Sequence, residues 1–220
     1  MKQAPDAPRK LTAAEERRKA VFDRTAAALA AAGYRQADLT IGIVRANVLA
    51  VVLCLPIVAV LLMAFFALHP EGGGGGLTLG GILGFFAVIL LLIFVHEGIH
   101  GLTWAVFAPN RLRAVSFGVI WQYLTPYCTC SQPLSRRAYA LGGMMPTVLL
   151  GILPAAAGIF TGSMVLWGIG AVMIFAGGGD LAIFLKLLSF RPGTGDVVYL
   201  DHPYECGLVA FLRAEEARDA

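Results

Sequence analysis

The sequence predicts an all-α membrane protein with four transmembrane helices and a small β-hairpin or re-entrant element after the second helix. The composition is the first reason: 58% of the 220 residues are hydrophobic, only 14% are charged, and the mean hydropathy is +0.74. Soluble domains carry roughly 25% charged residues. Four uncharged or nearly uncharged stretches are long enough to cross about 30 Å of hydrocarbon. The charges are also segregated, since residues 1–45 hold nine of the 17 Lys and Arg.

The first element that we expect is an Ala-rich, charged amphipathic helix over residues 11–33. Thr12 followed by Glu15 is a capping-box pattern for its start, and Gly33 is a suitable stop. No apolar core follows the first residues, so this segment does not resemble a signal peptide. The net charge of +3 is interpreted as charge facing the membrane surface, and no nucleic-acid partner is expected.

The four apolar segments are the predicted spans. They cover residues 46–68, 79–108, 138–160 and 164–188. Pro56 lies inside the first span, and three glycines ending at Gly179 lie near the middle of the fourth. The glycine run at residues 72–76 is expected to be a flexible loop, because no Lys-Ser/Thr pair follows it as a phosphate-binding loop requires.

Residues 110–135 differ from the spans because they are rich in aromatic and β-branched side chains. A strand is expected over residues 115–123, a bend at Thr125-Pro126-Tyr127, and a short return segment through Cys128 and Cys130. Irregular backbone at membrane depth is tolerated only where it is buried in protein or lines a cavity. We therefore expect this connector to form one wall of a site on the second span.

The orientation follows from the Arg and Lys content of the loops. The segments before the first span, between the second and third, and after the fourth are basic, whereas the other two connections carry no Lys or Arg. The positive-inside rule then places both termini in the cytoplasm. The predicted organisation is a cytoplasmic amphipathic segment (residues 1–45), a four-span membrane domain (46–190) and a polar cytoplasmic C-terminal tail (191–220).

The second span carries the motif with chemical content, His96-Glu97-Gly98-Ile99-His100. Histidines at i and i+4 lie on one helix face, so both imidazoles can reach one metal ion. The glutamate beside them can take a proton from a water molecule. Ionisable residues in a hydrophobic helix are costly and usually functional, so we predict His96 and His100 as zinc ligands and Glu97 as the catalytic base.

Asp180 is the predicted third ligand, because a catalytic zinc site has about three protein ligands. His100 lies eight residues before the end of its span at Ala108, and Asp180 lies eight residues before the end of its span at Leu188. The second and fourth spans run in the same direction, so these side chains reach a similar depth. The alternative is an Asp180 that only pairs with a histidine or with Lys186.

Four cysteines at irregular positions do not suggest a disulfide framework. Cys128 and Cys130 form a C-x-C pattern, which is not the usual spacing of a zinc site, and a structural or cavity-lining role is favoured. A second metal site that joins them to His202 and Cys206 is the alternative.

Several short motifs together resemble the bacterial DUF3267 family of zincin-type membrane peptidases, over roughly residues 34–210. The matching pieces are Arg45-Ala46-Asn47, His96 to Gly101, Cys128-Thr129-Cys130 before Pro133-Leu134, Gly178-Gly179-Asp180, Asp201-His202-Pro203 and Cys206-Gly207. The chain is also similar to the core of site-2 proteases, which place H-E-x-x-H on one membrane helix and a metal-binding Asp on a later one. The resemblance implies the same roles for His96, His100, Glu97 and Asp180, and a bacterial cell-membrane location.

The predicted function is zinc-dependent hydrolysis of a peptide bond in a membrane-associated protein or peptide, within or beside the lipid bilayer. One alternative is a catalytically inert membrane scaffold with a structural zinc site, which a fourth protein ligand in place of water would favour. The other is a metal transporter, which requires further acidic or His residues along a path across the membrane. The remaining predicted spans supply none.

Overall fold

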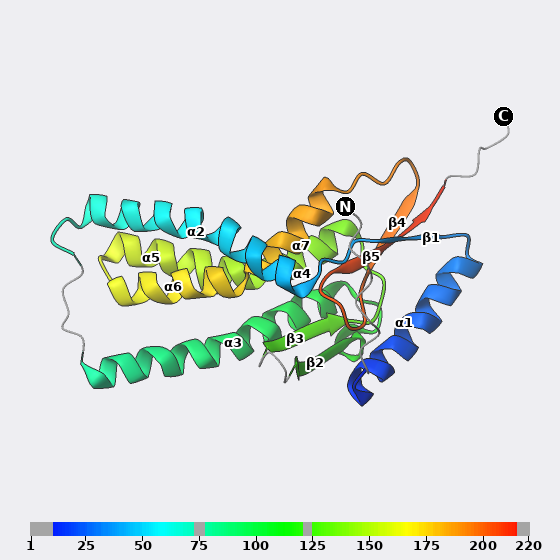
Figure 1. The fold of residues 1–220 in the computed structure, drawn as a ribbon, viewed down its shortest axis with the longest axis horizontal. Helices are drawn as coiled ribbons and strands as arrows, with labels where there is room; N and C mark the ends of the chain where they lie inside the picture. The colour runs from blue at the N-terminus through cyan, green and yellow to red at the C-terminus, as the bar shows by residue number, and fades with distance from the viewer. Residues whose placement is uncertain (1–10, 73–77, 121–124, 215–220) are drawn as a thin grey trace.

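The computed structural model describes residues 11–72, 78–120 and 125–214, and Figure 1 shows a bundle of long helices with a small sheet region at one end. The bundle contains α2 (Ile43–Leu68), α3 (Leu79–Phe107), α4 (Arg136–Pro146), α5 (Leu153–Thr161), α6 (Met164–Ala176) and α7 (Gly178–Ser189). A π-helical segment, η2 (Thr147–Ile152), joins α4 to α5, so that residues 136–161 form one long helical unit.

Three helical units are long and apolar enough to cross a membrane, namely Ile43–Leu68, Leu79–Phe107 and Arg136–Thr161. The pair α6 and α7 makes a fourth candidate, bent by 52° where the two helices meet. The sequence placed one helix over residues 164–188. The structure instead breaks it at Gly177, within the glycine run near the middle of this segment.

Helix packing in the bundle depends on small residues. The unit α5–α6 is a hairpin, and α6 contacts both α2 and α3. Helix α7 packs on α2, where a Cβ added to Gly178 would lie 2.5 Å from the Cβ of Ala50. Any larger side chain would therefore push these helices apart. Large side chains of α2 and α3 face outward, as Leu55 and Leu90 do, so the bundle presents an apolar exterior compatible with lipid.

A three-stranded antiparallel sheet in the order β1–β5–β4 corrects two sequence-based expectations. It consists of β1 (Arg35–Asp38), β4 (Asp196–Asp201) and β5 (Leu208–Arg213). The C-terminal region is therefore not a polar tail, because Leu208 to Phe211 are buried. The all-α class is also too simple, since the strands join segments from both ends of the chain. The boundaries of the three predicted domains remain a prediction.

Helix α1 (Ala13–Ala31) covers one face of this sheet, as the right-hand side of Figure 1 shows. Phe22, Ala26 and Leu29 pack against buried Leu200, Val209 and Phe211. The predicted capping box is present, with the Thr12 backbone N–H donating to Glu15 Oε2 at 2.8 Å and the Glu15 N–H donating to Thr12 Oγ1 at 3.3 Å. We refer to α1 and the three-stranded sheet together as the cap.

The expected β-hairpin follows α3, after a short 3-10 turn, η1 (Arg111–Ala114). Strand β2 (Val115–Ile120) pairs antiparallel with β3 (Thr125–Cys130). The bend predicted at Thr125-Pro126-Tyr127 is wrong, because these residues belong to β3 and Val119 pairs with Pro126. Residues 121–124, the end of the predicted first strand, lie outside the described residues, as does most of the predicted glycine loop at 72–76.

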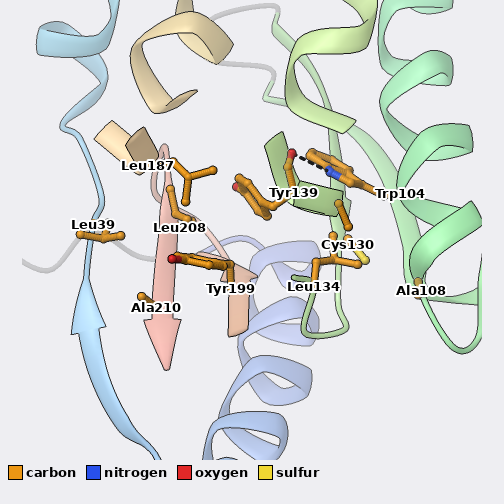
Figure 2. Packing of buried hydrophobic residues seen from close by; sticks show 12 residues of the cluster. Leu39, Trp104, Ala108, Cys130, Leu134, Tyr139, Leu187, Tyr199, Leu208 and Ala210 are labelled. Atoms are coloured by element: carbon orange, nitrogen blue, oxygen red, sulfur yellow. Dashed lines mark hydrogen bonds between the residues drawn. The ribbon is translucent and has the colours of Figure 1, made fainter. Parts of the chain in front are cut away.

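One hydrophobic cluster joins the cap, the hairpin and the bundle. Figure 2 shows Tyr199 of β4, Cys130 of β3, Tyr139 of α4 and Trp104 of α3 in this cluster. Leu134 pairs with Tyr199 by backbone hydrogen bonds of 2.8 and 2.9 Å and continues the contact between the sheet and the start of α4. The C-terminal end of α3 and the N-terminal end of α4 are therefore packed against the cap.

Candidate metal centre

Helix α3 places both predicted histidine ligands in the interior. His96 and His100 are 5% and 3% exposed, although most of the helix around them is apolar and faces outward. The ligand atoms of His96, Glu97 and His100 lie within 4.8 Å of one another. The i, i+4 spacing thus brings two imidazoles and one carboxylate to a common point, as predicted from the sequence.

Asp180 reaches the same point from the first turn of α7. Its Oδ2 atom lies 3.1 Å from His96 Nε2 and 3.4 Å from His100 Nε2. The bend at Gly177 and the close approach of Gly178 to α2 bring this turn toward α3. The matched depth expected for Asp180 and the two histidines is therefore present, and Asp180 pairs with both of them.

His100 has a defined tautomer when it is neutral. Its Nδ1 atom lies 2.7 Å from the backbone oxygen of Gly142, which can only accept a hydrogen bond, so Nδ1–H is the donor. The Nε2 atom then directs a lone pair toward the Asp180 carboxylate. Two electron-rich atoms facing each other require a positive charge between them, which a proton or a metal cation can supply.

These residues fit a zinc ion on two grounds. Two imidazoles and one carboxylate are a donor set of catalytic zinc sites. Ligand atoms of one tetrahedral zinc are separated by about 3.3–3.5 Å, given Zn–N and Zn–O bonds of about 2.0–2.2 Å. The observed nitrogen-to-oxygen distances of 3.1 and 3.4 Å are close to this separation. Among the described residues, His96 Nδ1 has no hydrogen-bond partner, unlike His100 Nδ1.

Glu97 lies beside the two histidines and faces the hairpin. It is half-buried, and the backbone N–H of Cys128 in β3 interacts with its carboxylate. Asp180 therefore contacts both imidazoles directly, whereas Glu97 lies near the same imidazoles and also faces the backbone of β3. The hairpin is a wall of the site, as the sequence analysis expected.

The four other candidate ligands do not assemble around a second metal. Within the described part of the chain, none of these four residues belongs to a group of three His, Cys, Asp or Glu side chains that could hold a metal ion. Burial raises the pKa of Cys130 and of Cys206 to about 11, and burial also raises the pKa of Cys128, so these thiols stay protonated. His202 Nδ1 accepts the Glu205 backbone N–H at 2.9 Å.

The sequence analysis missed the Gly142 carbonyl, which fixes the ring of His100. A backbone acceptor carries no sequence signature of its own. The signal available was the pair Gly142-Gly143 in an otherwise apolar helix, which favours close packing. A Cβ added to Gly142 would lie 2.0 Å from Trp104 Nε1, so only glycine allows α4 to approach α3 this closely.

A comparison with known protein families finds a match over the central part of the chain. The model of the DUF3267 family, described as "Putative zincin peptidase", matches residues 89–194. The matched segment contains His96, Glu97, His100 and Asp180, and it ends before β4 begins. No curated protein and no solved structure matches the chain. The family description indicates a metallopeptidase with zinc as its metal.

Proposed function

We propose that this chain is a zinc-dependent peptidase that hydrolyses a peptide bond of a membrane-associated protein within or beside the bilayer. One observation carries the proposal: the Asp180 carboxylate faces the Nε2 atoms of His96 and His100 at 3.1 and 3.4 Å, with Glu97 beside them, inside an apolar bundle. Ionisable groups in such a setting are energetically costly, and those that are present are usually functional. The family description supports the metallopeptidase chemistry.

His96, His100 and Asp180 are the residues that would hold the zinc ion. When bound there, zinc supplies Lewis acidity that polarises the scissile carbonyl and makes a water molecule more acidic. The Gly142 carbonyl holds the His100 ring so that Nε2 stays directed at the metal position. Glu97 is left out of the ligand set and keeps a carboxylate free for proton transfer.

Glu97 performs the acid–base chemistry in this proposal. It takes one proton from the attacking water as the water oxygen bonds to the carbonyl carbon of the substrate. It then donates that proton to the amide nitrogen as the carbon–nitrogen bond breaks, so the products are a carboxyl group and an amine. The Cys128 backbone N–H interacts with the Glu97 carboxylate and helps to direct it.

The substrate in this proposal is a membrane protein or peptide that presents an unwound segment. Carbonyl groups within a helix are already hydrogen-bonded and are therefore poor targets for attack. Water and the unwound segment would reach the site from the end of the bundle that carries the hairpin and the cap. Similarity to the core of site-2 proteases, in which H-E-x-x-H and an Asp come from two membrane helices, supports the same reading.

We also propose that the chain crosses a bacterial cell membrane four times, with α6 and α7 acting as one bent span. Figure 1 shows the α5–α6 turn at the same end of the bundle as the start of α3, opposite the cap and the hairpin. Arg111, Arg113 and Arg136 lie at the cap end, whereas the α5–α6 turn has no Lys or Arg. The cap and both termini are then cytoplasmic.

The enzymatic part is tested with Glu97→Gln, an isosteric change that cannot accept the proton. Zinc content of the purified protein is measured by elemental analysis, and new protein N-termini are identified by mass spectrometry in membranes that contain the wild type or the variant. We expect zinc in both proteins and new N-termini near membrane segments only with the wild type. Exposed Glu205→Gln is the matched control and should behave as the wild type.

Two outcomes would contradict the proposal. Identical N-termini with wild type and Glu97→Gln would remove Glu97 from the chemistry and leave an inert scaffold as the better account. Wild-type protein without zinc would remove the metal centre itself.

The orientation is tested by cysteine labelling in a background without the four native cysteines. A cysteine replacing Ser163 should react only with reagent outside the cell, and one replacing exposed Arg111 only after the cytoplasm is opened. Labelling of the Ser163 position from the cytoplasm alone would overturn the four-span arrangement.

A further inference from the structure

We infer that Asp201, the last residue of β4, is a positioning residue for the metal centre. The residue lies in the cap, beyond the segment that the family model matches. Its carboxylate joins the two elements that each touch one functional residue of α3. This inference rests on the proposed function, since it concerns how that site is held in place.

The first oxygen of Asp201 holds α4. Tyr139 on α4 is 5% exposed, and its hydroxyl donates a hydrogen bond to Asp201 Oδ1 at 2.5 Å. The next turn of the same helix carries Gly142, whose carbonyl accepts the bond from His100 Nδ1 at 2.7 Å. The position of α4 therefore determines whether His100 Nε2 faces the metal.

A second contact ties the same turn of α4 to α3. Figure 2 shows the indole of Trp104 donating from Nε1 to the Tyr139 carbonyl, a bond of 3.3 Å. The Trp104 ring stacks on the His100 ring, with centroids 5.2 Å apart and an interplanar angle of 18°. His100 is thus held on one face by Trp104 and at Nδ1 by Gly142, and both partners contact the helical turn that Asp201 anchors.

The second oxygen of Asp201 holds the hairpin. Asp201 Oδ2 accepts the backbone N–H of Cys130 in β3 at 2.7 Å. Two residues earlier, Cys128 lies in the same strand, which packs on α3 beside Glu97. One carboxylate therefore links the strand beside the base candidate and the helix beside the ligand His100. Hydrogen bonds to a charged group are among the stronger polar contacts in proteins, which suits such a linking role.

The chain contains a matched control for this arrangement. Asp196, at the other end of β4, also accepts a hydrogen bond from a tyrosine hydroxyl, that of Tyr34. Asp196 is exposed and lies at the opposite end of β4 from Asp201, where its partners are Tyr34 and Arg213. Asp196→Asn and Tyr34→Phe remove the same chemical groups as Asp201→Asn and Tyr139→Phe.

The test measures the zinc dissociation constant of each folded, detergent-purified protein at pH 7 by competition with a chromophoric chelator. Loss of groups that orient metal ligands typically weakens metal binding by about 10–100-fold, and we expect about tenfold for Asp201→Asn and about threefold for Tyr139→Phe. Asp196→Asn and Tyr34→Phe should stay within about twofold of wild type, because they leave the ligand orientation unchanged.

The melting temperature of the zinc-free proteins separates positioning from a purely structural role. A structural role lowers the melting temperature of Asp201→Asn and Tyr139→Phe while their folded fractions bind zinc as the wild type does, and that result overturns the inference. Should Asp201→Asn fail to fold, Tyr139→Phe decides alone, because it removes only one hydroxyl. Wild-type protein that holds no zinc sinks the proposed function together with this inference, whereas unchanged affinity in the variants sinks only the positioning role.

Discussion

The bundle and the cap are built on different physical principles, although they share one candidate site. The cap has a core like that of a water-soluble protein, in which Tyr199, Leu208 and Phe211 are at most 2% exposed. In the bundle, α2 and α3 turn large apolar side chains outward, and their contacts use small residues such as Gly178 and Ala50. Removal of apolar surface from water therefore stabilises the cap, whereas the bundle depends on close packing of small residues and has an apolar exterior compatible with lipid. Changes to each region should have different consequences.

The largest expected difference concerns two histidines, one in each region. His100→Ala should remove zinc almost completely, because a ligand is lost and the carboxylate of Asp180 loses a partner. His202→Ala should retain stoichiometric zinc. The His202 ring accepts a hydrogen bond from the Glu205 backbone and packs against the rings of Phe22 and Tyr204, and these residues are not at the metal centre. Elemental analysis of the two purified proteins measures both. Equal loss of zinc would show that the cap and the bundle share a metal site.

The next effect distinguishes the two kinds of core. Phe211→Ala should destabilise the cap by about 3–5 kcal/mol, the usual cost of removing a buried Phe side chain. Phe160→Ala at the end of α5 should change stability by less than about 0.5 kcal/mol, because this ring is 82% exposed and makes few protein contacts. Native-state hydrogen exchange of the cap amides measures the effect of Phe211→Ala. The thermal midpoint of the whole protein measures the effect of Phe160→Ala. A large effect of Phe160→Ala would mean that the outer face of the bundle has a protein partner.

A smaller effect tests small-residue packing in the bundle. A Cβ at Gly170 of α6 would lie 2.3 Å from the backbone nitrogen of Ala155, so Gly170→Ala should destabilise the bundle by about 1–3 kcal/mol. Gly84 in α3 has open space at the same position, and Gly84→Ala should be neutral or stabilise the helix by about 0.5–1 kcal/mol. Thermal denaturation in detergent compares the two. Destabilisation by both substitutions would show that helix packing near Gly84 is tighter than the structure indicates.

A pH dependence is also expected in the cap. Burial raises the pKa of Asp201 from its ordinary value of 3.8 to about 6, although the Tyr139 hydroxyl and the Cys130 amide act in the opposite direction. Between these two values the folded protein binds more protons than the unfolded chain, so this group makes the folded state less stable as pH rises from about 4 to 6. The free energy of cap opening in wild type should therefore fall over this interval, and Asp201→Asn should lack that component. An identical pH profile in both proteins would contradict it.

The sequence predicted the features that depend on local patterns. The spans follow from uninterrupted apolar residues, the start of α1 from Thr12 and Glu15, and the paired histidines from their spacing. The meeting of Asp180 with His96 and His100 followed from equal depth in two parallel helices, and the structure places these side chains within 3.4 Å. The assignment of these residues as ligands stays a prediction. Their assigned roles rest on the sequence pattern.

The features that were missed depend on contacts between distant segments. Strand β1 is a four-residue polar segment whose register with β5 no local pattern specifies, and β5 resembled part of a tail because it is short. The Gly142 carbonyl and the Asp201 carboxylate act through the placement of α4 and β3, which only the assembled fold determines. The position of the bend also differed from expectation, since Pro126 lies within β3, an edge strand, where it costs no ladder hydrogen bond.

The pairing of β1 with β5 gives the protein a defined order of assembly during synthesis. Arg35 pairs with Leu212, so the ribosome adds 177 further residues after Arg35 (212 minus 35) before its partner is in the chain. At about 5–20 residues per second, the nascent chain waits roughly 10–35 seconds for β5 to appear. The helices that carry His96, His100 and Asp180 are complete before then, but the sheet that presents Asp201 is not. A chain that ends before β5 would therefore carry His96, His100 and Asp180 without the completed sheet that presents Asp201, the residue we propose to position the site.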